Sequence, residues 1–135
     1  MKYGSHLIFC CFWDIFNNQR HRYFENPAIA RKIAIEIEQH ARDIGLIPMA
    51  VAVQPDHIHI YVRWNFSTPR DQWRTWQEAM QGLMKHVNTV THQINPSIPE
   101  NDKILSWYHF REVKDAYYSQ TVKNYINKQA AWYLC

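Results

Sequence analysis

Glycine and cysteine are scarce in this chain, with three of each in 135 residues. The cysteines Cys10, Cys11 and Cys135 are odd in number and form no CxxC pair, which argues against a disulfide framework and a zinc ribbon. This usage is typical of a reducing compartment, so we expect a cytoplasmic protein. A composition of 47% hydrophobic and 20% charged residues also excludes collagen, coiled coils and intrinsically disordered chains.

Long apolar runs are lacking as well. The run near the N-terminus, Leu7 to Trp13, is too short to span a bilayer. One lysine precedes it and no small-residue cleavage site follows it, so it does not have the pattern of a signal peptide. We expect a buried strand here and no membrane association.

The length predicts one domain over residues 1–135, which can bury a core without covalent cross-links. Aromatic residues make up 15% of the chain, more than a core of this size needs, so some should lie at the surface or in a site. The net charge of +3 permits nucleic-acid binding without requiring it.

Hydrophobic periodicity divides the chain into strands and helices. Apolar residues three and four apart predict one helix from Pro27 to Gly45 and a longer one from Trp73 to Ile94. A last helix is predicted from about Tyr117 to Tyr133, and residues 17–26 are predicted to form a loop. The predicted strands cover residues 6–13, 46–53, 57–64 and 104–113.

The order of these elements is β-α-β-β-α-β-α. The first six match the ferredoxin-like, split βαβ arrangement, an α+β fold with an antiparallel sheet and helices on one face. We expect the other face to stay open for a site. This fold serves many functions, so the function must come from particular residues.

A His-x-His pattern begins the third predicted strand. Because side chains alternate along a strand, His57, His59 and Tyr61 share one face, and the aliphatic residues between them share the other. Two imidazoles at this spacing can converge on one cation. The alternative is a chance pair of surface histidines on an edge strand, in a chain with eight histidines.

A Tyr-x-x-x-Gln pattern lies on the last predicted helix. Tyr125 and Gln129 are four residues apart and so neighbours on one face, beside an apolar stripe that runs from Val122 to Tyr133. A phenol oxygen can act as a nucleophile, and an amide oxygen can bind a metal. The alternative is that Tyr125 is an ordinary residue at an amphipathic boundary.

Together, the Pro-Asp turn with His57-Ile58-His59, the long amphipathic helix and the pair Tyr125 and Gln129 form a larger pattern. It resembles the single-tyrosine HUH transposases, the TnpA-like enzymes of insertion sequences that move as single-stranded DNA. The resemblance extends over nearly the whole chain, through the segments HLIF, VQPDHIHIYV, LMKHVNTVTHQI, SWYHFREV and TVKNYINKQ.

The resemblance implies a DNA transposase that cleaves and rejoins single-stranded DNA at insertion-sequence ends. His57, His59 and Gln129 would hold a divalent ion, Mg²⁺ or Mn²⁺, that polarises the scissile phosphate. Tyr125 would attack this phosphate and form a 5′-phosphotyrosine intermediate. Asp56 would either orient one of the two histidines or serve as an ordinary turn residue.

The resemblance also implies partners. Enzymes of this family bind hairpins at the ends of their elements and work as homodimers, in which the tyrosine helix of one subunit can complete the histidine pair of the other. The first strand is apolar enough to extend a sheet across such a dimer. Residues 114–119 could form the hinge that carries the last helix across.

A polar stripe without carboxylates follows the long helix, opposite its tryptophans and methionines. We consider it a candidate for phosphate contacts, with a plain solvated face as the alternative. Its members are Arg74, Gln81, Lys85, Asn88 and His92. Further candidates for DNA contact, nearer the site, are Arg63, Arg111, Lys123 and Lys128.

Three other functions fit parts of the pattern. A domesticated relative would apply the same chemistry to repeated palindromic chromosomal elements. A replication or relaxase-type nickase would use an HUH site too, but usually carries further domains. A non-catalytic ferredoxin-like RNA-binding module would stack bases on aromatic residues of the free sheet face and would need neither a metal nor Tyr125.

Overall fold

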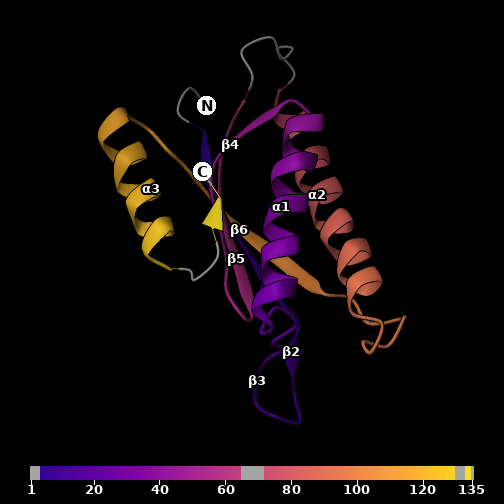
Figure 1. Ribbon diagram of the computed structural model, residues 1–135. Coiled ribbons are helices and arrows are strands. Elements are labelled where there is room, and N and C mark those ends of the chain that lie inside the picture. Colours follow the sequence, from indigo (N-terminus) through magenta and orange to yellow (C-terminus); the bar gives the residue numbers. More distant parts are fainter. Residues whose placement is uncertain (1–3, 65–71, 130–132, 135) are drawn as a thin grey trace.

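The computed structural model describes residues 4–64, 72–129 and 133–134. Figure 1 shows the arrangement of its helices and strands. In chain order the elements are β1 (Ser5–Cys11), β2 (Trp13–Asp14), β3 (Gln19–Arg20), α1 (Pro27–Asp43), β4 (Leu46–Val53), β5 (His57–Trp64), α2 (Gln72–Ile94), β6 (Leu105–Glu112), α3 (Ala116–Gln129) and β7 (Tyr133–Leu134).

The main sheet has five strands in the order β6-β1-β5-β4-β7, and every neighbouring pair is antiparallel. Its first four strands have the order that the split βαβ arrangement requires. The α+β fold with an antiparallel sheet is therefore confirmed. Helices α1 and α2 pack on one face, and α3 lies on the opposite face (Figure 1).

Local signals explain where α1 begins and ends. The Asn26 side chain accepts a hydrogen bond from the Ala28 amide at 2.9 Å, and Pro27 occupies the first turn, where its missing N–H costs nothing. Gly45 follows the helix with φ = +87°, a conformation that glycine adopts without strain. The predicted bounds of this helix are thus close to the observed ones.

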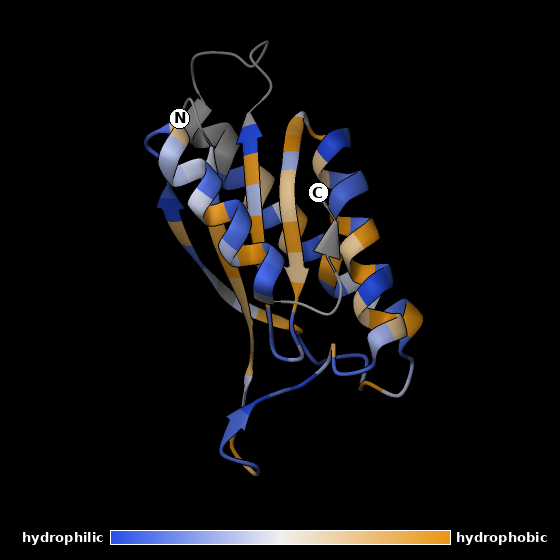
Figure 2. Ribbon diagram, turned by 60° about the vertical axis from the view of Figure 1, so that its left-hand side comes forward, coloured by the Kyte–Doolittle hydropathy of each residue, from blue (hydrophilic) through white to orange (hydrophobic). Residues whose placement is uncertain are grey.

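The core has two parts, one on each side of the sheet. The larger part lies under α1 and α2 and includes Ile58 and Ile60 of β5. The smaller part lies under α3, where Tyr61 packs with Val122 and Ile126. Figure 2 shows hydrophobic and hydrophilic residues alternating along the helices, as amphipathic helices require. The prediction of an open sheet face is wrong here, because α3 covers the face that carries Tyr61, which is fully buried.

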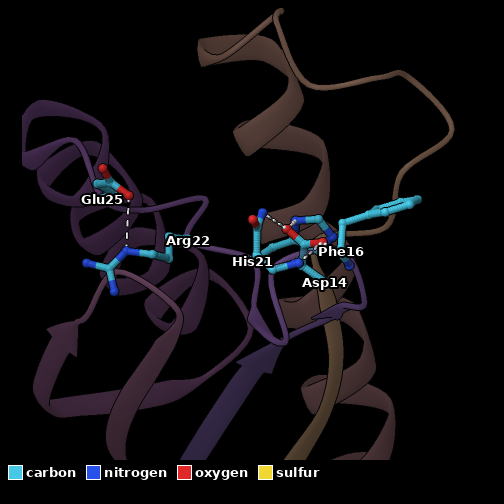
Figure 3. A network of polar contacts seen from close by, with 6 residues as sticks. Asp14, Phe16, His21, Arg22 and Glu25 are labelled. Atoms are coloured by element: carbon cyan, nitrogen blue, oxygen red, sulfur yellow. Dashed lines mark hydrogen bonds and ion pairs between the residues drawn. The ribbon is translucent and has the colours of Figure 1, made fainter.

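Residues 13–20 form a hairpin that projects from the end of the sheet, whereas a strand ending at residue 13 and a loop over residues 17–26 were predicted. Its strands β2 and β3 pair, and Asp14 accepts hydrogen bonds from the Phe16 amide at 3.0 Å and the Asn17 side chain at 2.7 Å (Figure 3). Asn18 has φ = 53°, which Asn tolerates better than most residues. The hydrogen bonds that the Asp14 side chain accepts from nearby backbone amides stabilise this short turn.

Two further expectations differ from the structure. Tyr133 lies in β7 and not in the last helix, which ends at Gln129. Strand β1 is paired on both sides, with β5 and with β6, so it has no free edge that could extend the sheet into a second subunit. Among the described residues, the edge strands of the main sheet are β6 and β7.

In the described part of the chain, no helix is long and apolar enough to cross a membrane.

Candidate active site

The two histidines of β5 lie on the side of the sheet that faces α3. His59 is opposite Ile8 of β1 and Ala52 of β4, so it sits in the middle of the sheet and is only 3% exposed. His57 lies at the start of the strand and is partly exposed. Their ring centroids are 5.0 Å apart. The structure therefore brings these imidazoles together as the His-x-His spacing predicts.

A third histidine joins them from β1. The Nε2 atom of His6 lies 3.1 Å from Nδ1 of His59, within hydrogen-bond distance, and the two rings stack with centroids 5.4 Å apart. If His59 donates through Nδ1, its Nε2 lone pair stays available for a ligand. Sequence reasoning missed His6 because 53 residues separate it from His59. The only local signal was a polar residue within the apolar strand β1.

Asp56 orients His57. The His57 Nδ1 atom lies 2.7 Å from the Asp56 Oδ1 atom. A carboxylate that accepts from Nδ1–H fixes the tautomer in which Nε2 carries the lone pair. Of the two alternatives for Asp56, an orienting residue or an ordinary turn residue, the structure thus favours the first.

Burial affects the protonation of two of these histidines. Desolvation, with a smaller effect of Arg111, lowers the pKa of His6 from 6.5 to about 4. Desolvation, together with smaller electrostatic effects of His57 and His6, lowers the pKa of His59 from 6.5 to about 4. His59 is therefore neutral at physiological pH, the form in which an imidazole can bind a cation.

Helix α3 is fixed at its start against the same sheet face. The Tyr118 amide donates to Asp115 Oδ1 at 2.7 Å, which caps the helix, and the Ser119 and Tyr61 hydroxyls lie 2.7 Å apart. Val122 and Ile126 are buried under the helix. Residues 114–119 therefore include a capped helix start that is bonded to β5, and their role as a hinge stays a prediction.

Tyr125 lies on α3 between the buried stripe and solvent, and its ring meets the histidines of its own chain. The ring centroid is 5.6 Å from that of His59 and 6.2 Å from that of His6, both edge to face. The residue is 48% exposed, so a ligand can reach it. The candidate nucleophile and the histidine pair therefore lie close together within one chain, and the arrangement of sites in a dimer stays a prediction.

The donor set suits a divalent cation. Asp56 and His6 each engage one ring nitrogen of a β5 histidine and leave the other nitrogen for a ligand. Within the described residues, no three His, Cys, Asp or Glu side chains gather in a metal-binding group, so a complete site needs another type of ligand. Gln129, the predicted amide ligand, is the last residue of α3, one turn beyond Tyr125, and its side chain lies outside what the structure describes.

The predicted polar stripe of α2 lies across the sheet from the histidines. Gln81 and Lys85 are exposed on it, while the Arg74 side chain lies outside what the structure describes. Asn88 accepts from the amides of residues 104 and 105 at 3.0 Å, and His92 lies 2.6 Å from the Asp102 carbonyl oxygen. These two side chains hold the connection between α2 and β6.

The remaining DNA-contact candidates lie on the side of α3. Arg63 is on the same face of β5 as His59 and is partly buried. Arg111 of β6 lies opposite His6 of β1. Lys123 and Lys128 of α3 flank Tyr125 in sequence, and Lys128 is exposed. Their role in DNA binding stays a prediction.

The lowered histidine pKa values predict a pH dependence of stability. Between pH 4 and 6.5 the unfolded chain binds more protons than the folded chain, so the free energy of unfolding falls as the pH decreases through this range. Because His6 and His59 share a hydrogen bond, we expect a combined loss of about 3 kcal/mol, and full stability above pH 6.5.

Urea denaturation of the protein in EDTA at pH 7, 6, 5 and 4 measures this loss. A His6→Gln variant is the matched comparison, because it leaves the other titrating groups unchanged, among them His40, whose pKa is lowered by burial and by the neighbouring His86. The variant should lose clearly less stability than the wild type over this range. Equal losses in the two proteins would contradict the assignment of the effect to this pair.

Comparisons with known proteins agree with this fold. No protein-family model and no curated protein matches the chain. A crystal structure from Deinococcus radiodurans R1, named as a transposase, superposes with a TM-score of 0.63 at 18% identity, covering 97% of this chain and 93% of that one. A REP-associated tyrosine transposase bound to a REP hairpin superposes with a TM-score of 0.52 at 13% identity, covering 93% of this chain and 66% of that one.

Proposed function

We propose that this protein is a single-tyrosine HUH transposase that cleaves and rejoins single-stranded DNA through a 5′-phosphotyrosine intermediate. The observation that carries the proposal is the position of the Tyr125 ring, which contacts His59 while His59 lies beside His57. The structural likeness to a tyrosine transposase supports the same class of chemistry. Either an active insertion sequence or a domesticated, repeat-associated copy fits this proposal.

In the proposed reaction, the Tyr125 phenol oxygen attacks the scissile phosphorus. The bond from phosphorus to the 3′ oxygen breaks, the 3′-hydroxyl leaves with a proton, and the phosphate stays on Tyr125 as a 5′-phosphotyrosine. A second 3′-hydroxyl can later displace Tyr125 and rejoin strands without an external energy source, because the bond energy is conserved in the intermediate.

His57, His59 and Gln129 are the residues that would hold the divalent ion, Mg²⁺ or Mn²⁺. When bound, this ion would supply positive charge next to a non-bridging oxygen of the scissile phosphate. Asp56 and His6 keep the two imidazoles in orientation and tautomer. The partly exposed position of Tyr125 leaves its phenol within reach of a flexible DNA backbone.

The substrate we propose is a hairpin with single-stranded flanks, as the REP-associated transposase is bound to a hairpin. Lys123, Lys128, Arg63 and Arg111 would contact its phosphates near the site, and the α2 stripe of Arg74, Gln81, Lys85, Asn88 and His92 would do so more distantly. We also propose that the protein forms a homodimer, with each active site complete within one chain.

The RNA-binding alternative receives less support. It needs exposed aromatic residues on an open sheet face, and α3 covers that face at Tyr61. Covalent chemistry separates the two functions, because an RNA-binding module needs no nucleophile.

Incubation with end-labelled single-stranded DNA from the flanks of its own gene tests the proposal. With Mg²⁺ or Mn²⁺ we expect a covalent protein–DNA adduct that survives denaturing electrophoresis, and binding that weakens steeply with salt. The perfect duplex of the same sequence is the control and should not be cleaved. Equal cleavage of the duplex, or no adduct with any flank strand, would contradict the proposal.

A further inference from the structure

A groove opens beside the candidate nucleophile, on the side of β6. Its volume is about 470 Å³. It is lined by His6 and Ile8 of β1, His109 and Arg111 of β6, and Tyr118 and Tyr125 of α3. His6 and Tyr125 also contact His59, so the groove runs directly into the histidine site.

The strand register explains how these side chains meet. His6 lies opposite Arg111, and Ile8 lies opposite His109, so all four side chains point to the face that α3 covers. Strand β6 is an edge strand, so within the described part of the chain no further strand closes that side of the groove. A polymer chain can therefore enter the groove from the side and does not have to be inserted from one of its ends.

The lining has the chemistry of a nucleotide site. Ile8 and the buried Val122 provide apolar surface, and the rings of His109, Tyr118 and Tyr125 offer faces or edges to a planar ligand. All residues that line the groove belong to the described part of the chain. They include Arg111 with its guanidinium group, and none of them carries a carboxylate. The volume is within the range of ordinary small-molecule pockets, roughly 300–1,000 Å³.

Arg111 is held in place at the rim of the groove. One of its terminal nitrogens lies 3.4 Å from the Tyr118 hydroxyl, which itself belongs to the capped first turn of α3. An arginine positioned in this way can bind a phosphate or the edge of a base through several N–H groups at once.

We propose that this groove holds one unpaired nucleotide next to the scissile phosphate, with its base between the aromatic side chains and its phosphate on Arg111. The proposal rests on the proposed function and adds the subsite that reads the substrate beside the cut. His109, Arg111 and Tyr118 would then determine which base is accepted at that position.

The test measures binding and does not depend on cleavage. The probe is a fluorescein-labelled single strand from the gene's own flank, in EDTA, with each nucleotide of the strand replaced in turn by an abasic residue. For the wild type, we expect one abasic position to weaken binding by roughly tenfold or more, the usual effect of losing one base stacked on aromatic side chains.

Two variants locate that effect. Arg111→Ala removes the cation, and Thr121→Tyr fills the groove from the exposed surface of α3. For both variants we expect weaker binding of the intact strand than for the wild type. An abasic residue at the sensitive position should then weaken their binding much less than it weakens that of the wild type. Arg31→Ala, at an exposed arginine of α1 on the other side of the sheet, is the matched control and should behave as the wild type.

Coupling between the abasic position and the groove variants supports the subsite. The proposed subsite would be overturned if the abasic residue weakened binding equally in the wild type and in both variants. It would also be overturned if no abasic position weakened binding. Failure of the proposed function is a distinct result: coupled binding would then be seen in EDTA, but no covalent adduct would form when the metal is added.

Discussion

Replacing Tyr125 with phenylalanine should abolish covalent attachment of DNA while leaving the folded protein intact. The substitution removes one oxygen from a side chain that is 48% exposed, so the free energy of unfolding should change by no more than about 0.5 kcal/mol. Because the phenol oxygen forms the new bond to phosphorus in the proposed reaction, adduct formation should fall by at least roughly 1,000-fold. Electrophoresis of the adduct and a thermal melt measure the two quantities.

Tyr117→Phe is the matched control for this experiment. Tyr117 lies on the same helix and is 85% exposed, but it does not line the groove beside the histidines. The control should form the adduct at the wild-type rate. An adduct that persists in Tyr125→Phe would identify another tyrosine as the nucleophile, and Tyr118 would be tested next because it lies in the same groove.

Removing either β5 histidine should have the second large effect. His57→Ala and His59→Ala each remove one imidazole of the proposed cation site, so each should abolish cleavage, as should EDTA. Asp56→Asn and His6→Ala act through those imidazoles and should cost about 10- to 100-fold in metal affinity or rate. Gln129→Ala should cost less than a histidine, because water can replace a neutral amide ligand.

The readouts are the cleavage rate and Mn²⁺ binding by calorimetry. His86→Ala is the control, since His86 lies on α2 and pairs with Glu36 at 3.0 Å, far from the site in the fold. Because His59 is buried, the folding of its variant is first checked by circular dichroism. His57 is partly exposed, so the His57 variant tests the metal site without the same risk of misfolding. Cleavage that continues unchanged in EDTA would remove the metal from the mechanism.

Much of the fold could be predicted because the local signals agree with one another. Alternation placed Ile58 and Ile60 against the helices, and Pro27 marked the start of α1. The hairpin of β2 and β3 was missed because its turn depends on side-chain bonds of Asp14, which hydrophobic periodicity cannot detect. The last helix was predicted too long because Tyr133 continues the apolar period although it lies in a strand.

The site could be predicted only where its residues are close in sequence. His57 and His59 share a strand, and the helical spacing of Tyr125 and Gln129 is visible in the chain. His6 and the groove depend on β1 lying between β5 and β6, a pairing that no local pattern determines. The position of α3 over Tyr61 is likewise set by packing, so the sequence pattern suggested an open sheet face instead.

The position of β1 between β5 and β6 has a consequence for protein synthesis. Both edges of β1 can be paired only after residues 57–64 and 105–112 have been synthesised. The helix that carries Tyr125 is synthesised after both of these segments. On the proposed function, a nascent chain therefore carries its histidines long before its nucleophile. On the same proposal, a product that terminates ahead of α3 would lack Tyr125 and could not form the covalent intermediate.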